Sequence, residues 1–178
     1  MKKIILTTLS LIVFSILIFS IYGWNYYDKY HIKPSKEPVK NFLEEFDKSK
    51  IELLNFEQIE NTNIWLAQLT FNDGQFGHAK FQEGWNHNLK FIYLRTNPSI
   101  TYEEYNTNKG KYGVLFVNNL DKNISKIKLK SQLNNFETEI DTSVSQTFVK
   151  TFKLPENVEN TSPATFSLYD KDGNLYND

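Results

Sequence analysis

Residues 4–24 read IILTTLSLIVFSILIFSIYGW, an apolar run without a charged residue. As an α-helix this run is roughly 31 Å long, about the thickness of the hydrocarbon core of a bilayer. Lys2 and Lys3 precede it, and positive charge beside a first span is retained in the cytoplasm. The aromatic residues that begin at Tyr22 suit the interfacial layer. The sequence therefore predicts a cytoplasmic tip and single-pass signal-anchor in residues 1–27, a bilayer contact through residues 4–24, and an extracellular carboxyl-terminal part at the cell membrane.

A cleaved signal peptide is the alternative interpretation of the same run. Signal peptides have a basic start and an apolar centre of about 7–15 residues, followed by a small-residue cleavage site. Here the run is longer and no Ala-x-Ala site follows it; the best cleavage point, after Gly23, has the bulky Ile21 three residues before the cut. The protein would be secreted if that cleavage took place.

The composition of the remaining part excludes several classes of function. The chain contains no cysteine, so disulfides, thiol catalysis and a lipidated amino-terminal cysteine are ruled out. After residue 24 there are 18 basic and 21 acidic residues, a net charge of −3, and Arg95 is the only arginine. We therefore expect no nucleic-acid partner, since such binding needs clustered basic residues.

Between the anchor and the first strands the sequence predicts a polar stalk and one short helix. The stalk is residues 28–34, DKYHIKP. The helix spans about 35–48, because Val39, Phe42, Leu43 and Phe46 recur at helical spacing and can cover a sheet.

The hydrophobic period then changes from helical spacing to two, which is typical of strands. Four strands are expected, near residues 51–59, 64–71, 76–81 and 89–96. The Asn-Asp-Gly turn at residues 72–74 makes a hairpin of the middle two. The whole of residues 35–96 is thus predicted to be an α+β unit, a helix with a four-stranded antiparallel meander.

The second half of the chain is predicted to be mainly β. Residues 97–111, NPSITYEEYNTNKGK, lack a periodic face and are expected to form a linker or long loop. Residues 112–178 contain short strands that begin near positions 112, 124, 136, 146 and 164 and are separated by polar turns, which favours a small immunoglobulin-like β-sandwich. In the second of these strands Lys126, Lys128 and Lys130 predict a solvated face that guards a sheet edge.

A resemblance follows from the order of these features. The basic start, the single span, the short helix, the element Gly84-Trp85-Asn86 and the ending DKDGNL at residues 170–175 resemble small membrane-anchored extracytoplasmic proteins of low-GC Gram-positive bacteria that have no characterised role. The resemblance implies membrane anchoring and no particular activity.

One candidate ligand site lies in the expected loop. Tyr102, Glu103, Glu104 and Tyr105 place two aromatic rings beside two carboxylates, which can bind a cation, a sugar or a basic peptide. Trp85 near a turn is a further candidate platform for a ligand. The alternative is that the glutamates only solubilise the loop and that the tryptophan packs.

Two weaker constellations contain metal-ligand types. His78 and His87 could approach across a turn and share zinc with Glu83, but their spacing fits no recognised zinc motif. Asp170, Asp172 and Asn174 resemble the start of a calcium loop, whose bidentate glutamate would fall beyond position 178. A hairpin turn explains the second group as well, with positive φ expected at residues 172–174. We therefore predict no metal and no cofactor.

Neither a GxSxG elbow nor a glycine-rich phosphate loop occurs in the sequence. The expected function is a non-catalytic binding or scaffolding module for another envelope protein. One alternative is an extracytoplasmic enzyme or inhibitor with a site near residues 97–111. Another is a sensor or immunity-type accessory that pairs through its span, where Ser10, Ser15 and Ser20 recur on roughly adjacent turns.

Overall fold

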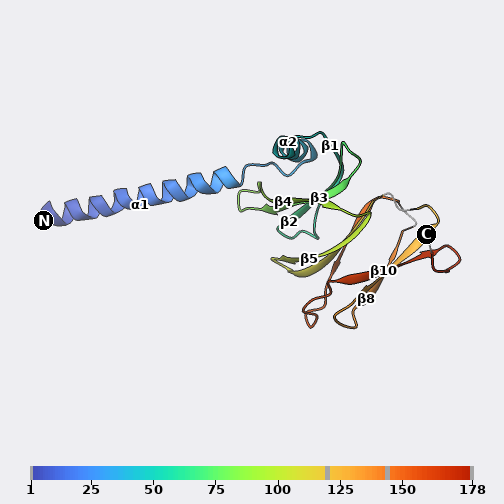
Figure 1. Cartoon of the computed structure of the whole chain (residues 1–178). Helices are drawn as coiled ribbons and strands as arrows, with labels where there is room; N and C mark the ends of the chain where they lie inside the picture. The colour runs from blue at the N-terminus through green and yellow to red at the C-terminus, as the bar shows by residue number, and fades with distance from the viewer. Residues whose placement is uncertain (1, 119–120, 143–144, 177–178) are drawn as a thin grey trace.

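A computed structural model describes residues 2–118, 121–142 and 145–176. In these residues the protein is mainly β, with two helices and ten strands arranged in three antiparallel sheets (Figure 1). The elements are α1 (Lys2–Lys29), α2 (Lys36–Asp47), β1 (Ile51–Gln58), β2 (Ile64–Phe71), β3 (Phe76–Glu83), β4 (Leu89–Asn97), β5 (Ile100–Thr107), β6 (Gly110–Val117), β7 (Ile124–Ser131), β8 (Glu137–Asp141), β9 (Phe148–Lys153) and β10 (Ala164–Asp170).

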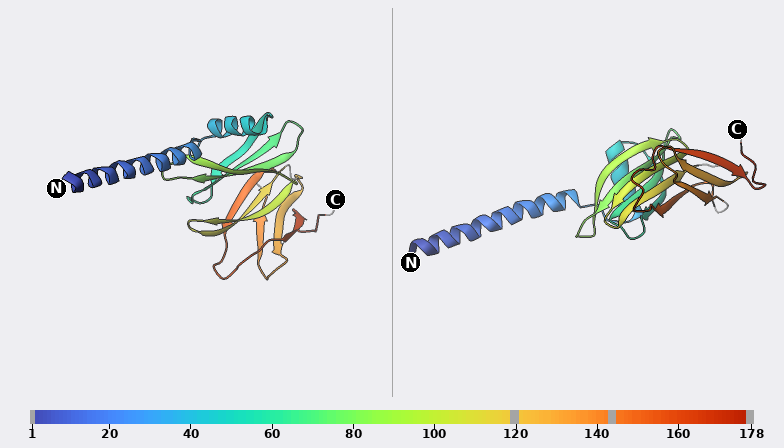
Figure 2. Two further views of the ribbon diagram at one scale, coloured as in Figure 1. Left: turned by 60° about the vertical axis from the view of Figure 1, so that its left-hand side comes forward. Right: turned by 90° about the horizontal axis from the view of Figure 1, so that it is seen from below.

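Helix α1 extends away from the rest of the molecule (Figures 1 and 2). Its apolar side chains from Leu11 to Trp24 have no protein partner to cover them, and the ring of Phe19 is 77% exposed. The hydroxyls of Ser15 and Ser20 donate hydrogen bonds to backbone carbonyls of the preceding turn, which lowers the cost of placing these hydroxyls in an apolar environment. Within the described ranges, α1 is the one helix long and apolar enough to cross a membrane.

The predicted stalk is partly wrong. Helix α1 continues to Lys29, and Ile32 then pairs with Leu89 through both backbone hydrogen bonds, N to O 3.2 and 2.7 Å. Ile32 is buried because its aliphatic side chain joins the core beneath α2. The segment therefore holds the helix close to β4 and does not act as a free spacer.

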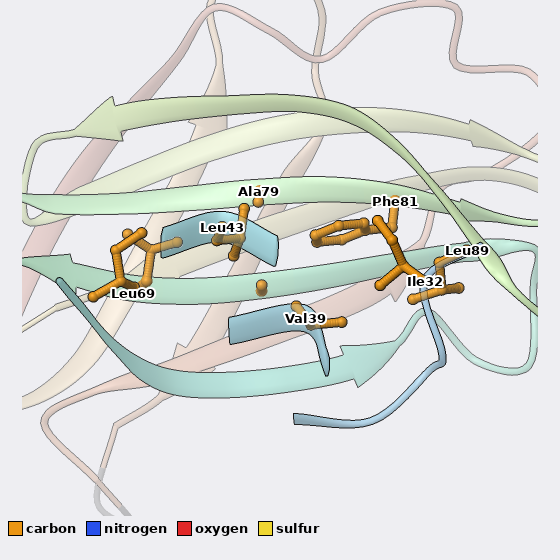
Figure 3. Close-up of a cluster of buried hydrophobic side chains, with 9 residues drawn as sticks. Ile32, Val39, Leu43, Leu69, Ala79, Phe81 and Leu89 are labelled. Atoms are coloured by element: carbon orange, nitrogen blue, oxygen red, sulfur yellow. The ribbon is translucent and has the colours of Figure 1, made fainter. Parts of the chain in front are cut away.

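The predicted α+β meander is confirmed. The sheet order is β1-β2-β3-β4, and α2 covers one face of it (Figure 3). Val39 and Leu43 of α2 are fully buried against Ala67, Leu69 and other residues of the sheet. Side chains alternate between the two faces of a strand, so Gln68 lies on the opposite face from its neighbours in β2.

The prediction of a loop at residues 97–111 is wrong, because most of this segment is strand β5. It forms a hairpin with β6, in which Thr107 pairs with Gly110. The strand is hard to recognise because Tyr102 and Tyr105, separated by three positions, point to opposite faces and are buried in different clusters.

The three sheets are stacked, and the sheet β5-β6-β9 is the middle one. One of its faces packs on the back of the β1–β4 sheet, through residues that include Leu66 and Phe116. Its other face packs on the sheet β10-β7-β8, through residues that include Leu115 and Ile127. The middle sheet is covered on both sides, which explains why β6 reads as a nearly continuous apolar run.

The lysines of β7 face solvent as predicted, but they do not guard an edge. Strand β7 is the central strand of its sheet, between β10 and β8. Lys126 and Lys128 form ion pairs across the sheet with Glu139 (3.0 Å) and Glu137 (2.6 Å) on β8. Cross-strand pairing of opposite charges explains the alternation.

Candidate functional site

The four residues of the predicted ligand loop lie on strand β5 and point in two directions. Tyr102 and Glu104 face the sheet β10-β7-β8 and the loop that precedes β10, whereas Glu103 and Tyr105 face the β1–β4 sheet. Successive side chains of a strand project to opposite faces. The four side chains therefore do not converge on one ligand.

Glu104 holds the loop between β9 and β10. Its Oε1 accepts hydrogen bonds from the backbone amide and hydroxyl of Thr161 and from the amide of Ser162, and Lys111 lies 3.4 Å from its Oε2. Burial alone would raise the pKa of Glu104, but these hydrogen bonds and the lysine more than offset it, so the pKa is lowered. Tyr102 also contacts the Thr161 hydroxyl, and burial raises the pKa of the tyrosine to about 12.

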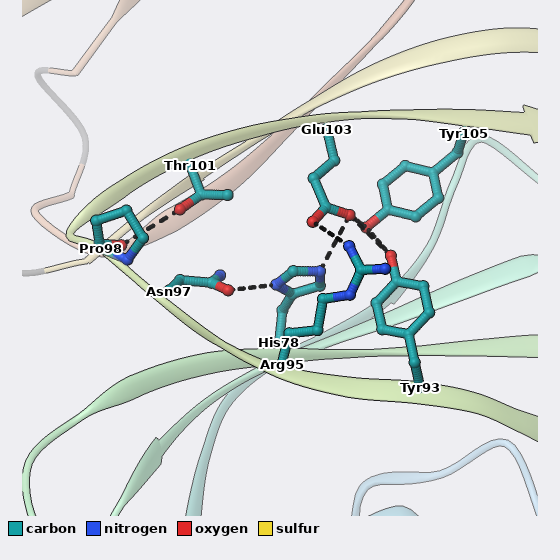
Figure 4. A network of polar contacts seen from close by, with 8 residues as sticks. All are labelled: His78, Tyr93, Arg95, Asn97, Pro98, Thr101, Glu103 and Tyr105. Atoms are coloured by element: carbon teal, nitrogen blue, oxygen red, sulfur yellow. Dashed lines mark hydrogen bonds and ion pairs between the residues drawn. The ribbon is translucent and has the colours of Figure 1, made fainter. Parts of the chain in front are cut away.

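Glu103 is the centre of a second polar group, which lies between the first two sheets (Figure 4). Its Oε2 accepts hydrogen bonds from the hydroxyls of Tyr93 and Tyr105, both at 2.8 Å, and lies 3.2 Å from Nε2 of His78. Its Oε1 lies 3.4 Å from the guanidinium of Arg95. We name these five residues the inter-sheet cluster; they come from β3, β4 and β5.

The charge on Glu103 is strongly stabilised. Burial opposes its ionisation, but the electrostatic interaction with the nearby imidazole of His78 and the hydrogen bonds from the two tyrosine hydroxyls outweigh this, so the pKa of Glu103 falls to about 2. Burial and the neighbouring carboxylate raise the pKa values of Tyr93 and Tyr105 well above their usual range. The cluster is thus a fixed carboxylate with neutral tyrosine donors.

His78 has no path to a substrate in this arrangement. Its side chain has no exposed surface, its ring stacks on Phe116 with centroids 4.4 Å apart, and its Nδ1 lies 2.8 Å from Oδ1 of Asn97. Its Nε2 is close to Glu103 at ion-pair distance but is not aligned as a hydrogen bond. The cluster therefore joins two sheets and does not form an open catalytic dyad.

Few features of the sequence indicate this cluster. His78 and Lys80 alternate with the buried Ala79 and Phe81 in β3, which indicates one polar face for that strand. That face is buried by a second sheet, which includes β5. Because residues 97–111 are expected to form a loop, the sequence does not predict this second sheet.

Trp85, the remaining candidate, does not lie on β5; it lies at the turn between β3 and β4. Its indole is 68% exposed and stacks on Tyr26 of α1, with ring centroids 4.9 Å apart. Its backbone amide donates to the Tyr26 hydroxyl at 2.6 Å, and Tyr26 stacks on Tyr30 at 4.5 Å. We name Tyr26, Tyr27, Tyr30 and Trp85 the aromatic collar, because they gather where α1 meets the β-rich part.

The structure does not bring either of the two weak metal-ligand constellations together as a metal site. His78 lies in the buried middle of β3, about 16 Å along the strand from Glu83 at its end. His87 is exposed and lies 2.9 Å from Glu83, which leaves a pair without the third ligand. Among the described residues no group of three or more histidine or carboxylate side chains could hold a metal ion.

Asp170 organises a hairpin turn at the proposed calcium loop. Its carboxylate accepts hydrogen bonds from the backbone amides of Asp172 (2.9 Å) and Asn174 (2.8 Å), and these contacts lower its pKa. Of the residues predicted to take positive φ, Gly173 does so, at 82°. The Asp170 carboxylate is therefore used by the turn itself.

No protein-family model matches the chain, and searches of curated proteins and of solved structures found no match.

Proposed function

We propose that this protein is a single-pass, membrane-anchored extracytoplasmic protein whose β-rich part is a non-catalytic binding or scaffolding module for another envelope protein. The observation that carries the proposal is helix α1, with apolar side chains that are exposed from Leu11 to Trp24. Exposing a continuous apolar surface of this length to water is costly, and a bilayer removes that cost.

The orientation follows from charge and from aromatic residues. The basic residues Lys2 and Lys3 favour a cytoplasmic start, and the aromatic collar at the other end of α1 matches the composition of a membrane interface. Interfacial tyrosine and tryptophan rings bury an apolar body while their polar atoms remain wet.

A non-catalytic role is supported by the way the polar groups of the β-rich part are used. Glu103 and Glu104, the carboxylates at the centre of the enzyme alternative, are bound by neighbouring strands and loops of the chain itself. Their pKa values are lowered, whereas a carboxyl group is most effective as a general acid or base at neutral pH when its pKa is raised towards 7.

The finer fold assignment also belongs to this proposal: an immunoglobulin-like sandwich in residues 100–176. The orders β5-β6-β9 and β10-β7-β8 correspond to strands A-B-E and F-C-C′ of that fold. Leu175 bridges to Tyr169 of β10, where strand G would begin. Sandwiches of this type commonly serve binding, which is an argument by analogy of fold.

Two measurements test the proposal. Full-length protein should remain in the membrane fraction after alkaline carbonate washing, and Phe14→Arg with Ile18→Arg should release it, because charge within a span is expensive. Crosslinking in intact cells should then recover a partner with the full-length chain and not with an anchor-only control of residues 1–34. Release of the unmodified protein by carbonate would contradict the anchor. Equal recovery with the control would contradict binding through the β-rich part.

A further inference from the structure

A hollow of about 500 Å³ lies where α1 meets strand β4. Its walls include Ile21, Tyr22, Tyr26 and Lys29 of α1, Tyr30 just beyond the helix, and Lys90 of β4. The hollow is therefore formed jointly by the membrane helix and the β-rich part, and it lies beside the aromatic collar.

The lining carries two positive charges and no negative one. Within the described part of the chain, neither Lys29 nor Lys90 has an ion pair or a side-chain hydrogen bond with a protein group. By contrast, Lys126 and Lys128 on β7 are each paired with a glutamate of β8. Two unpaired ammonium groups beside tyrosine rings form a cradle for an anion.

The hollow lies at the depth of lipid headgroups if α1 spans a membrane. Ile21 and Tyr22 belong to the end of the apolar run, which closes at Trp24, and Lys29 is about 7.5 Å beyond Trp24 along the helix. The headgroup layer on each side of a bilayer is about 5–8 Å thick. One end of the hollow thus meets acyl chains, and the other presents ammonium groups where lipid phosphates lie.

We propose that this hollow binds the headgroup of an anionic phospholipid of the outer leaflet, with its phosphodiester between Lys29 and Lys90 and its glycerol end against Ile21 and Tyr22. The inference rests on the proposed membrane anchoring and adds a specific ligand to it. In a zwitterionic lipid the positive amine cancels the negative charge of the phosphate, so the headgroup has no net charge to balance the two lysines. They therefore favour a headgroup with net negative charge.

The test uses full-length protein reconstituted in nanodiscs of equal parts phosphatidylglycerol and phosphatidylcholine. The protein is then extracted in mild detergent, and native mass spectrometry counts the phospholipids retained by each chain. The unmodified protein should retain one phosphatidylglycerol in preference to phosphatidylcholine. The double variant Lys29→Gln with Lys90→Gln should weaken that retention about 10- to 30-fold.

Two matched variants separate a defined site from general attraction. Lys33→Gln with Lys36→Gln removes two exposed charges nearby that do not line the hollow, and it should retain the lipid. Lys29→Arg with Lys90→Arg keeps both charges and should retain it as well, since guanidinium binds phosphate. Thermal unfolding of each variant in detergent establishes that it is folded.

Three results would overturn the lipid site: no preference for phosphatidylglycerol, equal loss in the Lys33 and Lys36 control, or displacement of the lipid by millimolar inorganic phosphate. Flotation of the protein with liposomes is measured first. Loss of flotation would refute the anchoring itself, whereas flotation without lipid retention would refute only the lipid site.

Discussion

Replacing Glu103 with glutamine should destabilise the protein in a way that depends on pH. The carboxylate faces His78 on β3, Tyr93 and Arg95 on β4, and Tyr105 on its own strand. Lys80 on β3 also interacts with its charge. Glutamine is similar in size but has no charge, so Glu103→Gln removes the charge-dependent part of these contacts.

The expected magnitude follows from the lowered pKa of Glu103. A fall from 4.5 to about 2 corresponds to about 3 kcal/mol of stability at neutral pH. The 19% exposure of the side chain lets solvent screen part of this, so we expect a loss of about 2–3 kcal/mol. Because the folded-state pKa lies below the unfolded one, the contribution is complete above about pH 5 and disappears as the pH falls towards 2.

The assay is the free energy of urea unfolding of full-length protein in a non-ionic detergent, followed by near-ultraviolet circular dichroism from pH 7 to pH 2. The difference between the unmodified protein and Glu103→Gln should shrink from about 2–3 kcal/mol at pH 7 to under about 0.5 kcal/mol at pH 2. Glu45→Gln, at an exposed position on α2, should change stability by less than about 0.5 kcal/mol. A difference that stays constant with pH would refute the assignment of the charge to this cluster.

Three further results are expected. A side chain at Gly84 would collide with the hydroxyl of Tyr26 and the ring of Tyr30, so Gly84→Ala should broaden the distance distribution between spin labels on α1 and on the β2–β3 turn; Gly23→Ala, which has nothing within 4 Å, should not, and equal broadening in both would argue against the collar. A Cβ at Gly113 would lie 2.5 Å from the Phe152 ring, so Gly113→Ala should cost about 1–3 kcal/mol in urea unfolding; an unchanged midpoint would show that the core there is loosely packed. Millimolar calcium should not raise the calorimetric melting temperature, because the Asp170 carboxylate already serves the turn; a calcium-dependent rise would revive the metal hypothesis.

The helices and the first sheet could be predicted from sequence because their signals are local. Val39 and Leu43 recur at the helical period and are buried between α2 and the first sheet, and the Asn-Asp-Gly turn before Gln75 closes the β2–β3 hairpin. Each of these elements buries one stripe or one face, which is the pattern that periodicity detects.

Strand β5 and the inter-sheet cluster were not predictable in the same way. Both faces of β5 are covered, one by the first sheet and the other by the third, so its tyrosines and glutamates do not alternate between apolar and polar positions. Glu103 is partly buried, and its compensation comes partly from Tyr93 on β4 and partly from His78 on β3, a strand that begins at Phe76, more than twenty residues earlier. Such long-range compensation leaves no local trace in one sequence.

The aromatic collar falls between these cases. The aromatic residues after the apolar run predicted an interface with the membrane, and Trp85 was recognised as an exposed candidate. Their contact with each other depends on the pairing of Ile32 with Leu89, which brings the end of α1 to β4. A free stalk at residues 28–34 would instead separate Trp85 from the aromatic residues of α1.

The topology of the chain is the most direct test of the account. Because the protein has no cysteine, single cysteines can be introduced at Lys2, before the apolar run of residues 4–24, and at Asp73, well after it. On intact cells a membrane-impermeant maleimide should label Asp73→Cys at once and should label Lys2→Cys only after the cells are permeabilised. Labelling of Lys2→Cys on intact cells with protection of Asp73→Cys, or recovery of both variants in the soluble fraction, would contradict an extracytoplasmic protein held by a single span.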